Sequence, residues 1–413
     1  MQPPPPSSAP SPTAAPKTGQ TGAPDVTIVM PCLNEFDSLP HCIANAHDAL
    51  AGIAAQYGLS GEIVIADNGS TDGSQQLAMQ LGARVVPVAR RGYGAALIGG
   101  CEAAHGRYIL MGDADGSYDF TEGVAMIGRL IDGADLCMGS RFRGGIAKGA
   151  MPWKNRYIGN PVLTGILNLF FRSGIGDAHC GLRALTSACF ADLRLSGTGM
   201  EFASEMVIKA SLKHKRIDEV PATLSVDLRD KAPHLRPWRD GWRHLRYLFM
   251  LSPTWVFGVP AAIALALGVA ILGYAILGKL GVHGGPEYFG TSWTMVASAL
   301  VTIGHLAAIM AIASHIYGVR SGYLVMKPGV RRLRPVLRLE TMLVAGMALI
   351  ALAIVGFAIV ASNWSARGYI ALADTLPLVL SCMAGVLGWQ TIFGGFLLAV
   401  VGGHDADFLG RTD

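Results

Sequence analysis

Charged residues are scarce in this 413-residue sequence, and long runs without any of them follow the first 246 residues. Asp, Glu, Lys and Arg make up 15% of the chain and hydrophobic residues 51%, which is apolar for a soluble protein. Four runs lack charge for longer than the roughly 20 residues that a membrane-spanning helix needs. Because soluble cores seldom contain four such runs in succession, we expect an all-α membrane domain of four transmembrane helices over residues 251–404. The runs cover 247–278, 288–319, 341–366 and 375–404.

The sequence also lacks any CxxC pair or cysteine–histidine cluster at zinc spacing. Its scattered cysteines favour free buried thiols in a reducing compartment. Residues 1–24 are rich in Pro, Ser, Ala and Thr without the apolar core of a signal peptide, so we expect a disordered tail there. A net charge of +4 is too small to indicate a nucleic-acid partner. The seven cysteines are Cys32, Cys42, Cys101, Cys137, Cys180, Cys189 and Cys382.

Basic residues are unevenly distributed among the loops that join the four runs. The first and third loops carry only Lys279 with Glu287 and Arg367 with Asp374. Short loops rich in Lys and Arg remain cytoplasmic, and an even number of spans places both chain ends on one side. We therefore expect a cytoplasmic N-terminal domain and a cytoplasmic tail over 405–413, in a bacterial-type inner membrane or its equivalent. The second loop holds Arg320, Lys327, Arg331, Arg332, Arg334 and Arg338.

One histidine, His305, lies near the middle of the second run. Such a residue indicates a proton or substrate path or, more often, a histidine hydrogen-bonded inside the helix bundle.

The first half of the chain contains no GxGxxG after its first strand pattern and no GxxxxGK[ST] anywhere, which argues against a dinucleotide site and a P-loop. Strand patterns alternate there with helical ones, such as the apolar spacing over 39–53. This alternation predicts an α/β domain over 25–233 with a doubly wound, mostly parallel sheet. The predicted strands are 26–30, 62–66, 85–88, 107–111 and 135–138.

Polar side chains gather where three of these strands end. Ligands of open α/β sheets bind beyond the carboxyl ends of the strands, so the set as a whole indicates a site, although each member alone is more often a cap or turn residue. The segment Gly92-Tyr93-Gly94 follows two arginines. It indicates either a loop whose backbone can approach a phosphate or a plain loop. The strand-end residues are Asn34 and Glu35, Asp67 and Asn68, and Asp113 and Asp115.

Two of these carboxylates, Asp113 and Asp115, are one residue apart after a hydrophobic strand. Divalent hard cations prefer oxygen ligands and keep positions open for substrate phosphates. The pair therefore predicts a site for Mg²⁺ or Mn²⁺, which would stabilise charge on a leaving nucleotide diphosphate. An Asp-rich turn is the alternative.

Together these motifs resemble the inverting glycosyltransferases of family 2, which have a GT-A fold. The resemblance covers roughly residues 25–250. More narrowly, the sequence is similar to the dolichol- and undecaprenyl-phosphate mannosyl- and glucosyltransferases, which serve cell-envelope glycan synthesis. The motifs are VMPCLNE at 29–35, ADNGSTD at 66–72, GDAD at 112–115, GSRF at 139–142 and DAHCGLR at 177–183.

The resemblance implies a role for each matching residue. Asp113 and Asp115 would be catalytic and would bind the metal, and Asp177 would lie near the reacting centre. Ser117 stands where relatives often have a glutamine ligand, which makes Asp119 a candidate third ligand. Arg141 and Arg156 would bind the acceptor phosphate. The nucleotide-sugar would contact Pro31, Asn34, Glu35, Asp67 and Asn68.

A lipid acceptor fits both the resemblance and the sequence. A phosphate monoester is already anionic at neutral pH, so it needs cations more than a general base. In 234–250 an apolar stripe runs beside an arginine stripe, which predicts an amphipathic helix at the membrane surface. A helix packed on the soluble domain is the alternative, and 161–171 is a second interfacial candidate. The stripes are Leu235, Trp238, Trp242, Leu245 and Phe249, and Arg236, Arg239, Arg243 and Arg246.

The predicted activity is hexose transfer from UDP-glucose or GDP-mannose to a polyprenyl phosphate, with inversion, at the cytoplasmic face of the membrane. The partners would be the nucleotide-sugar, the lipid acceptor and membrane lipids. A processive polysaccharide synthase would need QxxRW, which is absent. Transfer to a diacylglycerol or ceramide hydroxyl is the closer alternative. A membrane transporter with a nucleotide-sensing domain is the non-enzymatic one.

Overall fold

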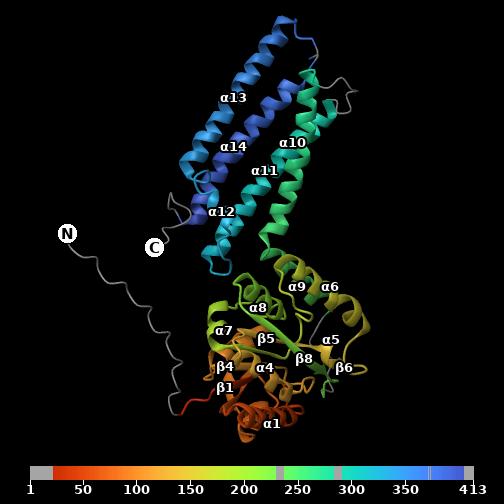
Figure 1. The fold of residues 1–413 in the computed structure, drawn as a ribbon, viewed down its shortest axis with the longest axis vertical. Coiled ribbons are helices and arrows are strands. Elements are labelled where there is room, and N and C mark those ends of the chain that lie inside the picture. Colours follow the sequence, from red (N-terminus) through yellow and green to blue (C-terminus); the bar gives the residue numbers. More distant parts are fainter. Residues whose placement is uncertain (1–21, 229–236, 283–290, 371, 373, 404–413) are drawn as a thin grey trace, which may run out of the picture.

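The computed structural model describes residues 22–228, 237–282, 291–370, 372 and 374–403 (Figure 1). Most of the predicted tail 1–24 and the predicted tail 405–413 therefore fall outside the described residues.

One mixed sheet organises the N-terminal domain. Within the described residues its strand order is β3-β2-β1-β4-β7-β5-β8-β6. All pairs are parallel except those of β7, which runs antiparallel between β4 and β5. The five predicted strands are confirmed, whereas β6, β7 and β8 were not predicted. The strands are β1 Val26–Cys32, β2 Gly61–Asp67, β3 Arg84–Pro87, β4 Tyr108–Met111, β5 Leu136–Ser140, β6 Gly145–Ile146, β7 Arg183–Thr186 and β8 Ile217–Leu224.

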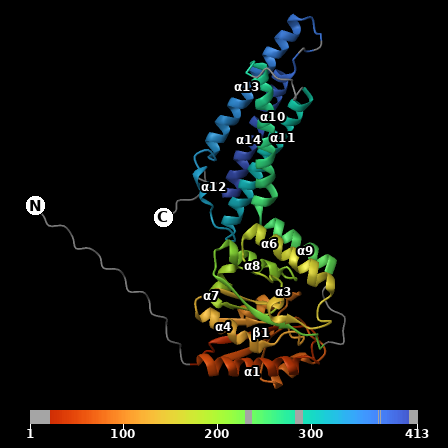
Figure 2. The same ribbon diagram turned by 45° about the vertical axis from the view of Figure 1, so that its right-hand side comes forward.

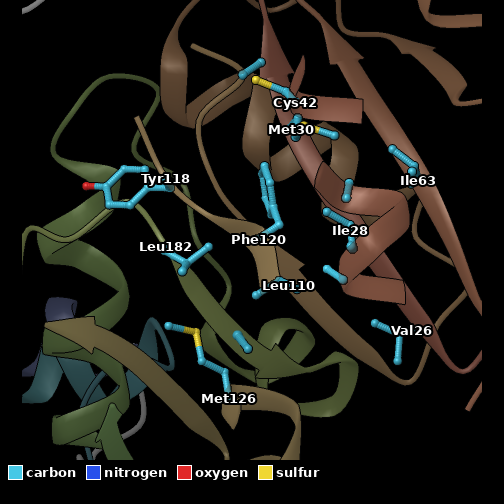
Figure 3. Close-up of a cluster of buried hydrophobic side chains, with 14 of the residues drawn as sticks. Val26, Ile28, Met30, Cys42, Ile63, Leu110, Tyr118, Phe120, Met126 and Leu182 are labelled. Carbon is cyan, nitrogen blue, oxygen red and sulfur yellow. The ribbon is translucent and has the colours of Figure 1, made fainter. Parts of the chain in front are cut away.

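Helices cover both faces of this sheet, as a doubly wound architecture requires. On one face Phe120 lies among apolar side chains of β1 and β4 (Figure 3). This face is covered by α1 Leu39–Tyr57, α2 Ser74–Gln80 and α4 Gly123–Ile131. The other face is covered by α3 Tyr93–Glu102, α6 Asn160–Phe171, α7 Ser187–Leu193 and α8 Phe202–Leu212.

Four long apolar helices follow, and each is long and apolar enough to cross a membrane. Within the described residues α10 packs on α11, α13 packs on α14, and α11 joins the two pairs. The predicted doubly wound α/β domain followed by four long apolar helices is confirmed. The helices are α10 Val259–Lys279, α11 Thr291–Arg320, α13 Leu339–Ala366 and α14 Leu376–Gly402, with the short α12 Pro328–Arg332 between α11 and α13.

Close glycine contacts and a few polar bonds hold the helix bundle together. Gly346 and Gly388 face each other, since a Cβ on either would lie 2.8 Å from the carbonyl oxygen of the other. His305 Nε2 bonds the Thr391 hydroxyl at 3.1 Å. The structure thus supports the hydrogen-bonded alternative for this histidine. At the end of the bundle far from the α/β domain, Lys279 pairs with Asp374 at 2.6 Å.

Two helices lie side by side where the α/β domain meets the bundle (Figure 2). They are α6 and α9 Pro237–Met250. The uncharged run that begins at residue 247 is divided: its first residues belong to α9, and the first candidate span begins at Thr254. Phe170 of α6 packs between Phe249 of α9 and Trp255, at centroid distances of 5.6 and 5.2 Å.

Large apolar side chains are exposed on both α6 and α9. Trp242 on α9 is 62% exposed and Leu169 on α6 is 57% exposed. The opposite side of α9 is buried through His244 and Leu248 against the α/β domain. One side of α9 therefore packs on the α/β domain, while its aromatic side is exposed.

Candidate active site

The parallel strands β1, β2 and β4 end at one edge of the sheet. Asn34, with a left-handed φ of 58°, accepts a hydrogen bond from Thr71 N–H at 2.8 Å, and its own N–H donates to Ser70 Oγ at 2.9 Å. Asp67 accepts bonds from Ser70 N–H and from Gln75 Nε2, the latter at 2.7 Å. The structure thus brings these predicted residues together, and their bonds join the loops after β1 and β2.

The remaining predicted nucleotide contacts are Pro31 on β1 and Glu35 on the loop that follows this strand. Glu35 is 8% exposed, and its N–H donates to Ser74 Oγ at 3.1 Å. The Ser38 hydroxyl donates to the Ala114 carbonyl at 2.6 Å, which ties this loop to the turn after β4. Pro31 is half-buried near the end of β1.

Asn68 and the glycine motif form a framework of protein contacts. Asn68 Nδ2 donates to the Arg90 carbonyl at 2.8 Å, and its Oδ1 accepts from Gly92 N–H at 2.7 Å. A Cβ on Gly92 would lie 2.2 Å from the Thr198 carbonyl oxygen, and one on Gly94 would clash with Gly197. The glycines therefore allow another loop of the protein to approach, which supports the plain-loop alternative for this motif.

Asp113 and Asp115 follow β4 at the same edge. Asp113 Oδ1 accepts a bond from the Tyr93 hydroxyl at 2.8 Å. Burial and the neighbouring Asp113 raise the pKa of Tyr93 well above its usual value, so this phenol remains a donor. Asp115 is 8% exposed, and its Oδ1 accepts from the N–H and hydroxyl of Ser117 at 3.0 and 2.6 Å.

The segment after β8 lies across the Asp115–Ser117 turn. Leu228 N–H donates to the Asp115 carbonyl at 2.8 Å, and Ser225 N–H donates to the Ser117 carbonyl at 2.9 Å. Gly116 has a φ of 79°, and a Cβ there would lie 2.6 Å from Leu228 Cδ1. A glycine at this position therefore permits both the turn and its cover.

The carboxylate pair fits a metal that binds together with a nucleotide. Mg²⁺ keeps several waters and is held in proteins by one or two carboxylates together with substrate phosphates. Asp113 and Asp115 supply that set of donors. Among the described residues no group of three or more His, Cys, Asp or Glu could hold a metal ion without such help.

The structure does not support Asp119 as a third ligand. Its Oδ1 accepts bonds from Asn45 Nδ2 at 2.8 Å and from the N–H and hydroxyl of Thr121 at 2.9 and 2.6 Å. Asp119 is thus the N-cap of a short 3₁₀ helix, Phe120–Glu122, and ties it to α1.

Arg141 and Asp177, which the resemblance implied to have separate roles, form one buried ion pair. Arg141 Nε and Nη2 donate to the two carboxylate oxygens of Asp177 at 2.7 and 2.8 Å, and Arg141 N–H donates to Oδ2 at 3.1 Å. Their side chains are 9% and 0% exposed. Glu219 holds the same loop through the N–H groups of Gly176 and Asp177. Both carboxylate oxygens of Asp177 therefore bond the Arg141 guanidinium.

Arg156 lies in a different environment. It belongs to a π-helical turn, Asn155–Gly159, that leads into α6. It is half-buried, with its guanidinium carbon 5.5 Å from the ring centroid of Tyr157, which is 69% exposed. This arginine is therefore placed beside the uncovered apolar face.

Two tyrosines of the site, the half-buried Tyr93 and the buried Tyr118, were not predicted as site residues. Besides Tyr93, Tyr118 is 6% exposed, and its hydroxyl oxygen accepts a bond from Gly181 N–H at 2.9 Å. Tyr93 could have been identified within the glycine motif, whereas Tyr118 has no local signal beyond its nearness to Asp115.

Comparison with known proteins identifies two matching family regions and a near full-length relative. Residues 27–193 match the description "Glycosyl transferase family 2", and residues 312–402 match "Glycosyltransferase family 2 C-terminal transmembrane region". The chain is 33% identical over 381 residues to the low-salt glycan biosynthesis hexosyltransferase Agl6 of Haloferax volcanii, covering 92% of this chain and 90% of that protein.

Two further proteins show a more distant likeness. A dolichyl-phosphate hexose transferase of Haloferax volcanii is 28% identical over 200 residues, which cover 48% of this chain and 81% of that protein. Among solved structures, glucosyl-3-phosphoglycerate synthase from Mycobacterium tuberculosis superposes with a TM-score of 0.40 at 18% identity, covering 55% of this chain and 78% of that one. The two matched regions and the near full-length relative lead to one conclusion: this chain is a membrane-embedded member of glycosyltransferase family 2.

Proposed function

We propose that this enzyme transfers a hexose from a nucleotide-sugar, UDP-glucose or GDP-mannose, to a polyprenyl phosphate at the cytoplasmic membrane face. The observation that carries the proposal is the placement of Asp113 and Asp115 at the sheet edge of a chain with four apolar helices. Its relatives named as hexose transferases, one of them acting on dolichyl phosphate, support the same class of reaction.

The donor would bind over the ends of β1, β2 and β4. Asn34, Asp67 and Asn68 hold the loops that frame this position, and Pro31 and Glu35 lie beside them. When bound at Asp113 and Asp115, Mg²⁺ or Mn²⁺ would neutralise charge that develops on the departing nucleotide diphosphate.

The ion pair between Asp177 and Arg141 favours a phosphate acceptor over a hydroxyl acceptor. A lipid hydroxyl must lose a proton as it attacks, so it needs a general base. Both carboxylate oxygens of Asp177 accept bonds from Arg141, which leaves this aspartate poorly suited to that task. A phosphate monoester is anionic already: its oxygen attacks the anomeric carbon, and the bond from that carbon to the nucleotide diphosphate breaks with inversion.

The acceptor would approach from the membrane along α6 and α9. Their uncovered apolar side chains fit the hydrocarbon boundary of a bilayer. Arg156, beside this face, would bind the acceptor phosphate, and Arg141, oriented by Asp177, would contribute its Nη1, which bonds no other group among the described residues.

A transfer assay with the purified full chain in vesicles tests the proposal. Radiolabelled UDP-glucose and GDP-mannose are offered separately with polyprenyl phosphate, diacylglycerol or ceramide. We expect a lipid product only with polyprenyl phosphate, and mild acid should release the sugar because a glycosyl phosphate is labile. An acid-stable glycolipid made from diacylglycerol or ceramide would contradict the proposal.

A further inference from the structure

A buried polar cluster connects the candidate active site to α9. His179 Nε2 lies 3.3 Å from the Ser204 hydroxyl, and His244 Nδ1 lies 2.8 Å from the same oxygen. The two imidazole rings are perpendicular, with centroids 4.9 Å apart. Ser204 is fully buried and His244 is 6% exposed. We call His179, Ser204 and His244 the histidine relay.

Each member of the histidine relay comes from a different element. His179 belongs to the loop that carries Asp177, and its N–H donates to an Asp177 carboxylate oxygen at 3.3 Å. Ser204 lies on α8, and His244 lies on the buried side of α9. The relay therefore runs from the helix that borders the membrane to the loop that orients Arg141.

The single hydroxyl proton of Ser204 limits which ring nitrogens of the relay can carry a proton. The single proton of the Ser204 hydroxyl can be donated to only one of the two rings. The other ring must then donate its own N–H to the Ser204 oxygen. In both arrangements the rings hold fixed tautomers, and His179 Nδ1 is a buried atom without a hydrogen-bond partner among the described residues.

The surroundings of His179 favour the neutral form of this ring. Burial, followed by His244, Arg141 and Arg183, lowers the pKa of His179 well below its usual value. The Arg183 guanidinium donates to the carbonyls of Cys180 and Ala203, so it braces the loop and α8 beside the relay. A neutral His179 can complete the hydrogen bonds that the Ser204 hydroxyl requires.

We propose that His179, Ser204 and His244 are positioning residues that hold the Asp177 loop, and through it Arg141, in place against α9. Buried polar groups are costly unless they are bonded, so this cluster fixes the separation of α8, α9 and the loop more tightly than apolar packing would. The proposal rests on the proposed transferase function, because Arg141 is assigned there to the acceptor phosphate.

Two substitutions of His179 separate this role from a general packing role. Glutamine can place an amide near the position of Nε2, whereas asparagine can place one only near Nδ1. In His179→Gln the bond to Ser204 is kept, and we expect at least half of the wild-type kcat. In His179→Asn, as in Ser204→Ala, we expect kcat to fall by about 10- to 100-fold, the usual effect of losing a residue that orients a site residue.

The controls decide between the possible explanations. The KM for the nucleotide-sugar should remain unchanged in every variant, because the hydrogen bonds of His179 and Ser204 join the Asp177 loop, α8 and α9. Ser211→Ala removes a hydroxyl from the same helix that bonds only its own helix, to the Val207 carbonyl, and should retain full activity. Thermal midpoints are measured for each variant to compare stability with kcat.

Three results would overturn the proposal: wild-type kcat in His179→Asn and Ser204→Ala, an equal loss in His179→Gln and His179→Asn, or losses that follow the thermal midpoint alone. The comparison is made with whichever lipid acceptor the wild type uses. If the wild type is inactive on polyprenyl phosphate, the proposed function is refuted. If the wild type is active but His179→Gln and His179→Asn have the same kcat, the positioning role of the relay is refuted.

Discussion

At the scale of single residues, Asp115 and Asp119 are matched aspartates with different surroundings. Asp115 lies at the sheet edge with Asp113, whereas Asp119 caps a short helix. We predict that Asp115→Asn lowers kcat by about a hundredfold or more, because it removes charge stabilisation in the transition state. Asp119→Asn should retain most activity and cost at most about 1 kcal/mol of stability.

Transfer assays and thermal unfolding of both variants check this prediction. Equal loss of activity in the two variants would return Asp119 to the metal site. Undiminished wild-type turnover in excess EDTA would remove the metal role of Asp115.

A second prediction at this scale concerns pH. His179 has a lowered pKa in the folded protein, chiefly because it is buried. Above the unfolded pKa of about 6.5 both states are neutral, and below it the unfolded chain binds a proton that the folded chain does not. The free energy of unfolding should therefore fall on acidification, by up to about 1.4 kcal/mol per pH unit, until the folded pKa is reached.

Thermal midpoints of the wild type and His179→Gln, measured between pH 7.5 and 5, check this pH dependence. The wild type should lose more stability over this interval than the variant, because glutamine does not titrate. Parallel curves would show that His179 binds protons equally in both states.

At the scale of elements, the π-helical turn before α6 places Arg156 beside the uncovered apolar face. We predict that Arg156→Ala raises the apparent KM for polyprenyl phosphate and leaves the donor KM unchanged, because the interaction is already made in the ground state. Arg156→Lys should restore binding only in part, since an ammonium cannot form paired hydrogen bonds.

Arg172→Ala is the matched control, because this exposed arginine caps the other end of α6. It should leave both KM values unchanged. A defect of Arg156→Ala confined to nucleotide binding, titrated without lipid, would show that this arginine serves the donor instead.

The contact between α13 and α14 is a second feature at this scale. A Cβ on Gly388 would lie 2.8 Å from the Gly346 carbonyl oxygen. We predict that Gly388→Ala destabilises the bundle by about 1–3 kcal/mol, because the helices must separate to accept the methyl group. Gly273→Ala on α10 meets nothing within 4 Å and should be neutral. Thermal unfolding in detergent compares the two, and equal midpoints would contradict the close packing.

At the scale of the whole molecule, the α/β domain, α12 and the C-terminal end of α14 lie at one end of the bundle (Figure 1). Arg320 Nη1 donates to the Val401 carbonyl at 3.1 Å, which joins the ends of α11 and α14. We predict that this end is cytoplasmic, as the basic loop 320–338 indicates.

Cysteine labelling in intact cells measures the orientation. Val330→Cys should be protected from an impermeant reagent, and Arg367→Cys at the opposite end should be labelled. The reverse pattern would invert the topology and place the candidate active site outside the cell.

The sequence alone determined the features that depend on local patterns. Uncharged runs that are long enough to cross a bilayer as helices predicted four spans. Apolar periodicity predicted α1 and five of the strands. Asp113 and Asp115 could be placed at a strand end because β4 immediately precedes them. These inferences required only the order of residues along one element.

Only the tertiary structure decided what the polar residues of the site contact. β7 is a four-residue strand that pairs antiparallel with β4, with Met111 opposite Arg183, so the partners are far apart in the sequence and no local pattern reveals the strand. The Arg141–Asp177 pair joins residues 36 positions apart, and Ser204 and His244 are 40 apart. The resemblance implied separate roles for Arg141 and Asp177, whereas in the folded chain the two form one ion pair. The reason is physical: a buried charge or imidazole must find its hydrogen bonds wherever the packed chain offers them.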